Sequence, residues 1–372
     1  MSGTVSAPAA RLLIGGAAPA GTRLMDCRIA QSRYGRGDTF EARCAVQPDA
    51  ARWWDPAGTG NTIDASIQIA VMSGPLAIPA WTTMFRGLVD GIDWDAVGGE
   101  VHITGRDYLG RLRDLAVQQD WLNHTGSEIL VLLIQAAGLT ADVQLAGDGM
   151  SGAFYTTQHK RSAGAGKHRF SSAFDLARYI VDGANCDLWA DGMVVRVRPR
   201  PTGAASRTIT YVPPPPGGGS ATMPVWGLGL RRDMLIDRGV IVKVSSWDSR
   251  QRQTHAYYWS KSGGSRTSPA SANADVYAYT PPGLSDGEVQ QRAAQFYAET
   301  IAHTREVSFT MQGDLVLMPR MRVALAGTGS SWDGTLDVDE VTRSLSVDTG
   351  FEQSVVLRTR VTPANVDDEE SD

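Results

Sequence analysis

Two stretches that lie far apart in the sequence carry the same short pattern. Each has an aromatic residue, a glycine two places later, and then an aliphatic residue followed by aspartate: Phe85, Gly87 and Val89-Asp90 in the first, and Trp332, Gly334 and Leu336-Asp337 in the second. Each continues through turn-forming residues into a second run rich in aliphatic residues, 101–106 and 355–360. Because an internal repeat sets the architecture of a chain, the sequence predicts two related β modules. Gly87 and Gly334 are expected where a strand bends or another backbone approaches closely.

Residues 10–110 show the alternation typical of half-buried antiparallel strands. Met25, Cys27 and Ile29 alternate with polar or smaller residues, and Phe40, Ala42 and Cys44 do the same. Such alternation places one face of each strand toward a core. The region is therefore predicted to be a β barrel or sandwich of about six strands. Cys27 and Cys44 both fall on the inward face, which favours a packing role over a redox role.

After Leu109 the period of the apolar residues changes from two to that of a helix. Two capping boxes, at 125–128 and 172–175, each precede apolar residues at helical spacing. Asp191-Gly192 lies between two short alternating runs, which predicts a two-residue hairpin. Residues 111–205 are thus expected to form a small α+β domain, with a long glycine-rich loop at 147–167.

The remaining boundaries follow from composition. Prolines and glycines at 213–219 predict a linker over 206–224. The second β module is expected from 225–259 and 305–362, interrupted by an inserted loop and helix at 260–304, where 285–288 is a third capping box. Residues 1–9 are expected to be a flexible N-terminus, and 363–372 an acidic disordered tail, because it has little apolar surface to bury.

Charge and cysteine content exclude several classes of protein. The formal net charge of the chain is −5, and the acidic residues of 367–372 account for it. The rest therefore has no basic field for holding nucleic acid or an anionic membrane. Three cysteines show no zinc or CxxC spacing. No apolar run is long enough to span a bilayer, and no signal peptide is evident, so synthesis in the cytoplasm is expected.

The sequence contains no set of residues typical of a catalytic site. The histidines are scattered, and there is no nucleophile elbow or P-loop. Residues 147–152 match GxGxxG, but no strand precedes them and no capped helix follows at once, which disfavours dinucleotide binding. Asp337, Asp339 and Glu340 could form a glycosidase-like carboxylate set, yet a solvated or inter-subunit face is favoured. The basic residues 160–161 and 167–169 lack interleaved aromatics and are interpreted as a solvated loop. We therefore predict no catalytic, cofactor-binding or metal-binding residues.

The first repeat and its continuation resemble a known family. The run Phe85-x-Gly87-x-Val89-Asp90, then Val101-x-Ile103-x-Gly105-Arg106-Asp107-Tyr108 and Leu112-x-Asp114-Leu115, is similar to the late-control and baseplate-hub proteins of tailed bacteriophages, which are kin to the hub part of type VI secretion spikes. The run from Met318-Pro319 through 327–329 and 332–334 to 355–357 looks like the closing barrel of that family. The resemblance covers nearly the whole chain in order.

The resemblance implies a fold and a set of partners. The fold class is mainly β with α+β inserts: two tube-like antiparallel β-barrel domains, a small α+β domain and a helical and loop insertion. The implied function is a non-enzymatic virion protein, a homotrimeric tail-tip or baseplate hub. It would join the sixfold tail tube to a threefold spike or central fibre as part of the channel for genome delivery.

The implied partners are the tail tube protein, the distal tail ring, a separate spike or fibre protein, and the tape-measure protein. Sequence-specific nucleic acid and membrane insertion are not implied, and the chain would be made in the cytoplasm of a bacterial host. Alternatives remain open: the hub of a type VI-like or bacteriocin particle, a tail-associated cell-wall or polysaccharide hydrolase, and a stand-alone ligand-binding β protein.

Overall fold

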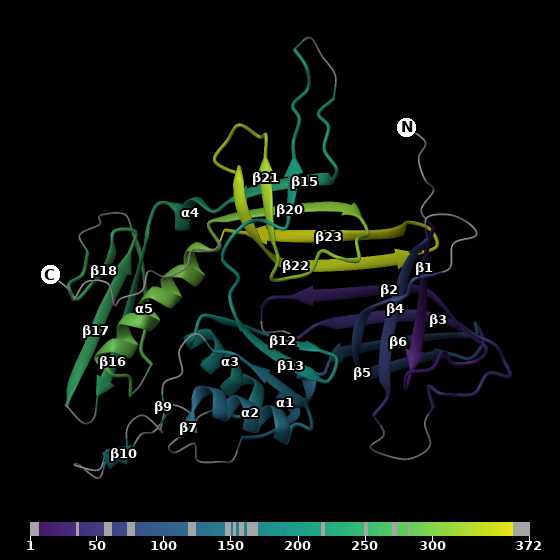
Figure 1. Ribbon diagram of the computed structural model, residues 1–372, viewed down its shortest axis with the longest axis horizontal. Helices are drawn as coiled ribbons and strands as arrows, with labels where there is room; N and C mark the ends of the chain where they lie inside the picture. Colours follow the sequence, from purple (N-terminus) through teal and green to yellow (C-terminus); the bar gives the residue numbers. More distant parts are fainter. Residues whose placement is uncertain are drawn as a thin grey trace.

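The computed structural model is mainly β with small α+β parts, as the sequence predicts (Figure 1). The residues described are 7–34, 37–55, 62–72, 79–117, 124–145, 150–151, 154–155, 160–161, 170–216, 220–248, 252–269, 274–281 and 283–359. The acidic tail expected at 363–372 lies outside them. The prediction of a flexible N-terminus over 1–9 is wrong for residues 7–9, which open strand β1 and pair with β4.

The first β module has six strands in the spatial order β1-β4-β5-β6-β3-β2, all antiparallel. They are β1 (Ala7–Ile14), β2 (Thr22–Ser32), β3 (Thr39–Val46), β4 (Asp64–Met72), β5 (Thr82–Asp95) and β6 (Glu100–Asp107). Inward positions such as Ile29, Phe40 and Ile67 are buried, and the predicted inward face of Cys27 and Cys44 is confirmed. The alternation therefore arises because one face of each strand packs on the module's own core.

The second β module has the same strand order, β14-β21-β22-β23-β20-β15. Its strands are β14 (Arg207–Thr210), β15 (Trp226–Arg232), β20 (Arg305–Gln312), β21 (Arg322–Ala326), β22 (Gly334–Ser346) and β23 (Gly350–Arg358). The order matches the first module strand for strand, except that β14 runs parallel to β21. The linker predicted at 206–224 is therefore wrong in part, since β14 lies within it and supplies buried Ile209 to the core.

The predicted extent of the second module also needs correction. Residues 240–259 do not join it. They form β16 (Val240–Asp248) and most of β17 (Gln253–Ser260), which pair with β18 (Gly263–Ser265) and β19 (Asp275–Tyr279) in a separate four-stranded sheet. Helix α5 (Asp286–Ile301) covers that sheet and buries Val289 and Ala293 on it, and α4 (Met234–Asp237) leads into it. These strands pack against α5 and share a hydrophobic core with it. The inserted module is therefore larger than the predicted loop and helix.

The α+β domain is built on three helices and a three-stranded sheet. The helices are α1 (Leu109–Asp114), α2 (Gly126–Ala136) and α3 (Ala173–Gly183); the sheet is β8 (Thr140–Val143), β12 (Cys186–Asp191) and β13 (Val194–Pro199); the short strands are β7 (His124–Thr125), β9 (Met150–Ser151), β10 (Phe154–Tyr155) and β11 (Lys160–Arg161). The capping boxes of Thr125 and Ser285 are confirmed, and Ser172 caps α3. The predicted Asp191-Gly192 hairpin joins β12 to β13.

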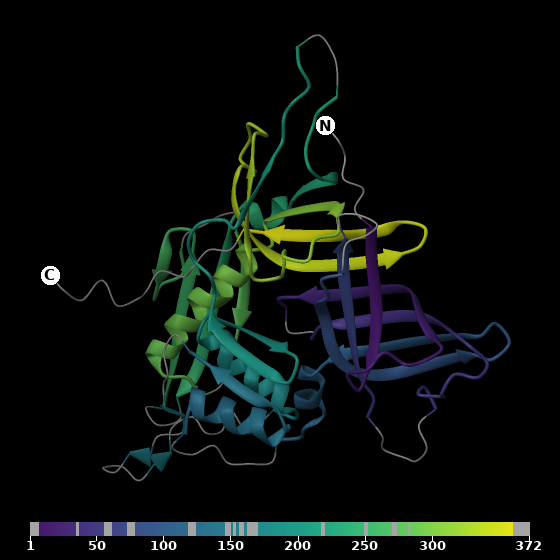
Figure 2. The same ribbon diagram turned by 45° about the vertical axis from the view of Figure 1, so that its right-hand side comes forward.

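The two β modules fuse through one pair of strands. β2 pairs antiparallel with β22, from Cys27 opposite Leu345 to Ser32 opposite Glu340. The result is one continuous sheet of twelve strands. Figures 1 and 2 show the second module lying along the edge of the first, and the inserted module on the far side of the molecule from the first module. No helix among the described residues is long and apolar enough to cross a membrane.

The structure confirms the repeat but shifts its register. In each module the long strand has a bulge, and the extra residue is Asp90 in β5 and Asp339 in β22. Each bulged aspartate forms an ion pair with an arginine on the next strand, Arg106 at 3.0 Å and Arg358 at 3.5 Å. Asp90 thus corresponds to Asp339, whereas the sequence pattern had aligned it with Asp337. The two alignments differ by two residues. Because side chains alternate between the faces of a strand, a shift by an even number leaves each residue on the same face.

Candidate functional site

A buried arginine ties three parts of the molecule together. The Arg33 guanidinium donates through Nε and Nη2 to both carboxylate oxygens of Asp187, each at 2.8 Å, and through Nη1 to Asp337 at 2.9 Å. Arg33 follows β2, Asp187 lies on β12, and Asp337 lies on β22. All three residues are at most 4% exposed. Burial alone would lower the pKa of Arg33, but the two carboxylates outweigh burial and raise it.

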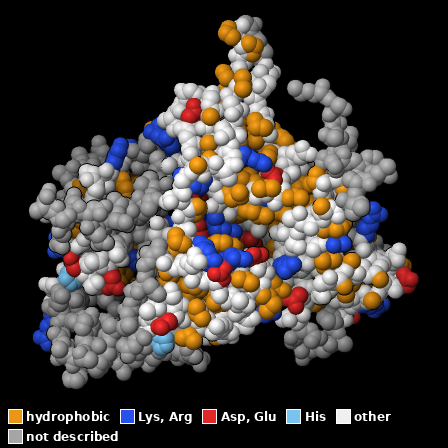
Figure 3. All heavy atoms as spheres, viewed as in Figure 1, with side chains coloured by type: hydrophobic (Ala, Val, Ile, Leu, Met, Phe, Trp, Pro, Cys, Tyr) orange, Lys and Arg blue, Asp and Glu red, His pale blue; other side chains and the backbone are white. Residues whose placement is uncertain are grey.

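A second group of charges lies beside the first. The Tyr34 hydroxyl donates to Asp339 at 2.6 Å, and Arg358 donates to Glu306 at 2.5 Å while its Nη1 lies 3.5 Å from Asp339. Asp339 is fully buried. Figure 3 shows basic and acidic side chains gathered in the middle of this face, where the modules meet. Every carboxylate of the two groups thus has an arginine or tyrosine donor, which is the condition for burying charge without a large penalty.

Arg343 extends this network into the joint between the β modules. Its side chain, 1% exposed, donates to the backbone carbonyls of Asp314 and Leu317 and to the Gln31 side chain at 2.5 Å. Burial lowers the pKa of Arg343 to about 10, although the charges of Asp314 and Asp38 oppose the shift. The residue stands opposite Ile29 in the β2–β22 ladder. It therefore fixes the loop before β21 against the joint.

Two buried acids line a cleft beside the joint. The Asp107 carboxylate accepts from the backbone N–H groups of Asp38 and Leu109 at 3.0 and 3.1 Å, and Asp38 accepts from Ser32 and Gln31. Burial, and then the charge of Asp38, raises the pKa of Asp107 to about 7. Burial also raises the pKa of Asp38, against the opposing charge of Arg320. The cleft has a volume of about 540 Å³.

The floor and wall of this cleft come from different modules. The Arg320 guanidinium stacks on the Trp189 ring at 4.7 Å, and Met84 and Phe85 of β5 lie beside them. Burial lowers the pKa of Arg320. The arrangement combines apolar surface, one arginine and two raised-pKa acids. It can hold a polar side chain of a partner, but it shows no nucleophile paired with a base.

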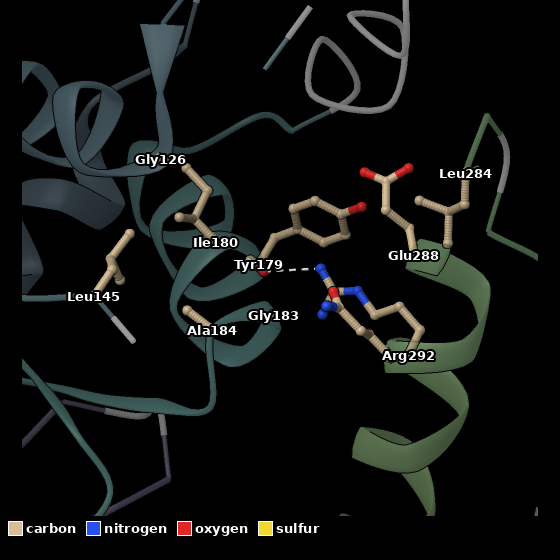
Figure 4. Close-up of a pocket in the computed structure, with 10 residues that line it drawn as sticks. Gly126, Leu145, Tyr179, Ile180, Gly183, Ala184, Leu284, Glu288 and Arg292 are labelled. Atoms are coloured by element: carbon tan, nitrogen blue, oxygen red, sulfur yellow. Dashed lines mark hydrogen bonds between the residues drawn. The ribbon is translucent and has the colours of Figure 1, made fainter. Parts of the chain in front are cut away.

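A smaller cavity of about 180 Å³ separates the α+β domain from the inserted module (Figure 4). Arg292 of α5 lies over the Tyr179 ring at 4.3 Å and donates to the Tyr179 carbonyl oxygen at 3.1 Å. Figure 4 shows both side chains pointing toward each other across the gap, with Glu288 above them. The contact holds α5 against α3.

The structure places the candidate carboxylates of the sequence differently from expectation. Asp337 and Asp339 are buried, and Glu340 is partly buried, so the solvated or inter-subunit face favoured for them is wrong. They face neighbouring modules of the same chain because β22 is the strand at which those modules meet. Arg33 and Asp187 have no motif in the sequence. No local signal marks them, because Arg33 lies just beyond the end of β2 and the burial of β12 does not alternate around Asp187.

The structure describes only part of the other sequence candidates. The GxGxxG stretch at 147–152 lies mostly outside the described residues, and so does the basic patch at 167–169, whereas residues 160–161 form β11. Within the part of the chain that the structure describes, no cluster of His, Cys, Asp and Glu could hold a metal ion. A side chain at Gly87 would meet the Arg106 carbonyl oxygen, which confirms the predicted close approach. Gly334 has open space around it but a φ of +152°, so its role is conformational.

Known proteins resemble this chain in fold and not in sequence. No family model and no curated protein matches the sequence. Among solved structures, the chain is similar to a tail protein from Neisseria meningitidis, with a TM-score of 0.67 and 12% identity over 95% of this chain and 97% of that one. It is similar to the 43 kDa tail protein of prophage MuSo2 from Shewanella oneidensis, with a TM-score of 0.62 and 12% identity over 95% and 98%.

A third similar structure comes from secretion machinery. It is an E. coli component of the type VI secretion system, described as structurally similar to tail proteins of bacteriophage T4. The TM-score is 0.54 and the identity 11%, over 95% of this chain and 79% of that one. At these identities the likeness shows a shared fold, which is the fold expected from the baseplate-hub resemblance.

Proposed function

We propose that this protein is the hub of a phage tail tip or baseplate, a structural component of the virion made in the cytoplasm of a bacterial host. The observation that carries the proposal is the pair of β modules with one strand order, fused edge to edge in a single chain. Two tail proteins of similar fold, matched over almost their whole length, support it.

The duplicated module explains how such a hub would work. A tail tube made of six-subunit rings needs six equivalent contacts, whereas a spike of threefold symmetry needs three. Three copies of a chain with two equivalent modules supply both, and a head-to-tail interface closes into a ring when the rotation permits. The proposed partners are the last tube ring or distal tail ring, a spike or central fibre, and the tape-measure protein. The ring's lumen would form part of the channel for genome delivery.

The buried charge network supports a structural rather than an enzymatic role. Asp337 and Asp339 are held by Arg33, Tyr34 and Arg358, so they are not free to act as a paired acid and base on a saccharide. The network instead fixes the relative positions of three modules.

The test is the mass of the assembled chain. Native mass spectrometry of the purified protein at high concentration is expected to show a trimer, and addition of the matching tube protein is expected to give a complex with three hub chains per tube ring. A monomer that also fails to bind tube protein would overturn the proposal. The same hub in a type VI-like or bacteriocin particle would give the same mass, and microscopy of the assembled particle separates these cases.

A further inference from the structure

Within one chain, the pairing of β2 with β22 joins the two β modules, and we call this contact the internal joint. It serves as a template for a contact between two copies of the chain. In the internal joint, β2 of the first module pairs with the second half of β22. Strand order makes β15 the counterpart of β2 and β5 the counterpart of β22. If modules repeat around a ring, β15 of one copy must meet the second half of β5 on the next copy.

Both strands have the free edge that such a joint needs. β15 is the last strand of the twelve-stranded sheet, and among the described residues it pairs with β20 alone. Residues 91–95 of β5 pair with β6 on one side. On their other side the described residues provide no strand, because the β4 pairing ends at Leu88. Unpaired edges of this kind recruit another strand.

The internal joint also fixes the register. Ala30 of β2 stands opposite Thr342 of β22. In the first module Ala30 pairs with Thr39, which pairs with Arg106. In the second module Arg231 pairs with Glu306, which pairs with Arg358. Because Arg106 and Arg358 occupy matching positions, Arg231 is the counterpart of Ala30. The counterpart of Thr342 is Asp93, since each lies three residues after its bulged aspartate. The template therefore sets Arg231 directly opposite Asp93, and Leu230 opposite Trp94.

The side chains at these positions are complementary in charge and in apolar character. Arg231 and Arg232 are exposed on β15, and Asp93 and Asp95 are exposed on β5. Neither Arg231 nor Asp93 has an ion-pair partner within the described part of the chain. Leu230 and Trp94 are large apolar side chains that are 39% and 41% exposed. Opposite charges and apolar pairs facing across strands stabilise pairing.

We propose that β15 of one copy pairs antiparallel with residues 91–95 of a second copy, with Arg231 facing Asp93 and Leu230 facing Trp94. The inference rests on the proposed function and names the surface by which copies of this chain join. Each copy uses β15 on one side and β5 on the other, so the contact is head to tail.

Disulfide trapping tests the register. The double variant Arg231→Cys/Asp93→Cys is expected to cross-link into dimers and trimers under mild oxidation, because directly opposite Cβ atoms lie about 4.5–5.5 Å apart. The matched control, Arg231→Cys/Val97→Cys, moves one thiol to a fully exposed turn residue, roughly 13 Å along the strand, and is expected to cross-link at least about tenfold less. The native cysteines are buried, and burial raises the pKa of Cys27 and Cys44 to about 12, so they stay unreactive.

Charge exchange gives an independent measurement. Arg231→Glu alone and Asp93→Lys alone are each expected to weaken self-association roughly tenfold, and the double variant is expected to restore it to within about threefold. A multimer by native mass spectrometry that neither cross-links at 231–93 nor responds to charge exchange would overturn this interface and leave the hub function standing. A chain that stays monomeric at the highest attainable concentration and does not bind tube protein would overturn both.

Discussion

Arg33 carries its charge into the interior and meets two carboxylates from different modules, Asp187 and Asp337. Each partner is 4% exposed or less. The pair of contacts places β12 and β22 at fixed positions relative to the end of β2. A buried pair of this kind adds little net stability over an apolar contact, but its geometry is demanding and its removal is costly. At the scale of single residues, the molecule thus uses charge to specify how its modules are arranged.

Removing the Arg33 side chain should be strongly destabilising. Arg33→Ala leaves Asp187 and Asp337 buried and without that cation, which is expected to lower the free energy of unfolding by about 3–5 kcal/mol. The control Arg43→Ala breaks an ion pair with Asp26 whose arginine side chain is 49% exposed, and should cost at most about 1 kcal/mol. Urea denaturation at pH 7 measures both. Equal losses for the two variants would refute the assignment of Arg33 as a module-joining residue.

The acid pair beside the cleft should make stability depend on pH. The ordinary pKa of Asp107 is 3.8, and burial raises it to about 7 in the folded protein. Between these values the folded state binds more protons than the unfolded state, so this contribution to stability is complete below about pH 4 and is lost as pH rises through about 7.

Asp107→Asn is therefore expected to flatten the decline in unfolding free energy between about pH 4 and pH 7, by up to about 1.4 kcal/mol per pH unit. The matched control is Asp49→Asn, on an exposed turn. Denaturation curves at the two pH values provide the measurement. A decline that is as steep in Asp107→Asn as in the original protein would show that another group is responsible.

At the scale of elements, β22 has the most neighbours. Its first half pairs with β21, its second half pairs with β2, and β23 accompanies it along almost its whole length. β5 is built the same way with β4 and β6, but among the described residues no strand takes the position that corresponds to β2. The bulges at Asp90 and Asp339 occur where each long strand changes partner, as expected for a feature that re-aims a strand.

Gly105 tests how closely β5 and β6 must approach for this geometry. A side chain at Gly105 would meet the Leu88 carbonyl oxygen and the Phe40 ring. Gly105→Ala is therefore expected to destabilise the first module by about 2 kcal/mol or more. Gly287→Ala, in the first turn of α5 where nothing lies within 4 Å, is expected to be neutral or to stabilise by up to about 1 kcal/mol. Thermal unfolding compares the two, and a neutral Gly105→Ala would contradict the close approach.

At the scale of the whole molecule, the twelve-stranded sheet carries two smaller bodies, the α+β domain and the inserted module. Figures 1 and 2 show these two lying side by side. Each has its own core, so what joins them is the interface between α3 and α5 rather than a shared interior. The contact of Arg292 with Tyr179 is the central part of that interface.

Arg292→Ala should loosen this interface without unfolding either body. Across the interface the variant loses one hydrogen bond and one cation–π contact, which is expected to cost about 1–2 kcal/mol. It should appear as faster amide exchange at the end of α3 and along the facing side of α5. The control Arg266→Ala removes a side chain that is 69% exposed and pairs with Asp286 of the same helix. Exchange that is unchanged in Arg292→Ala would place the joining contacts elsewhere.

The sequence by itself determined the elements and the duplication. Alternation at period two identified the strands of the first module, capping boxes located α2, α3 and α5, and the Asp191-Gly192 turn identified a hairpin. These signals are local, because they arise from the geometry of a strand, a helix terminus or a turn. The predicted repeat is also present in the structure, since each β module has an aspartate at its bulge that pairs with an arginine on the next strand.

Only the tertiary structure decided which strands share a sheet and which charges share a site. Residues 240–259 alternate like those of the β modules, yet they pack on α5 instead. Arg33 and Asp187 lie far apart in the chain and meet only because β2, β12 and β22 converge. Alternation records that a face is buried, not what buries it, so partner choice depends on contacts between residues distant in sequence.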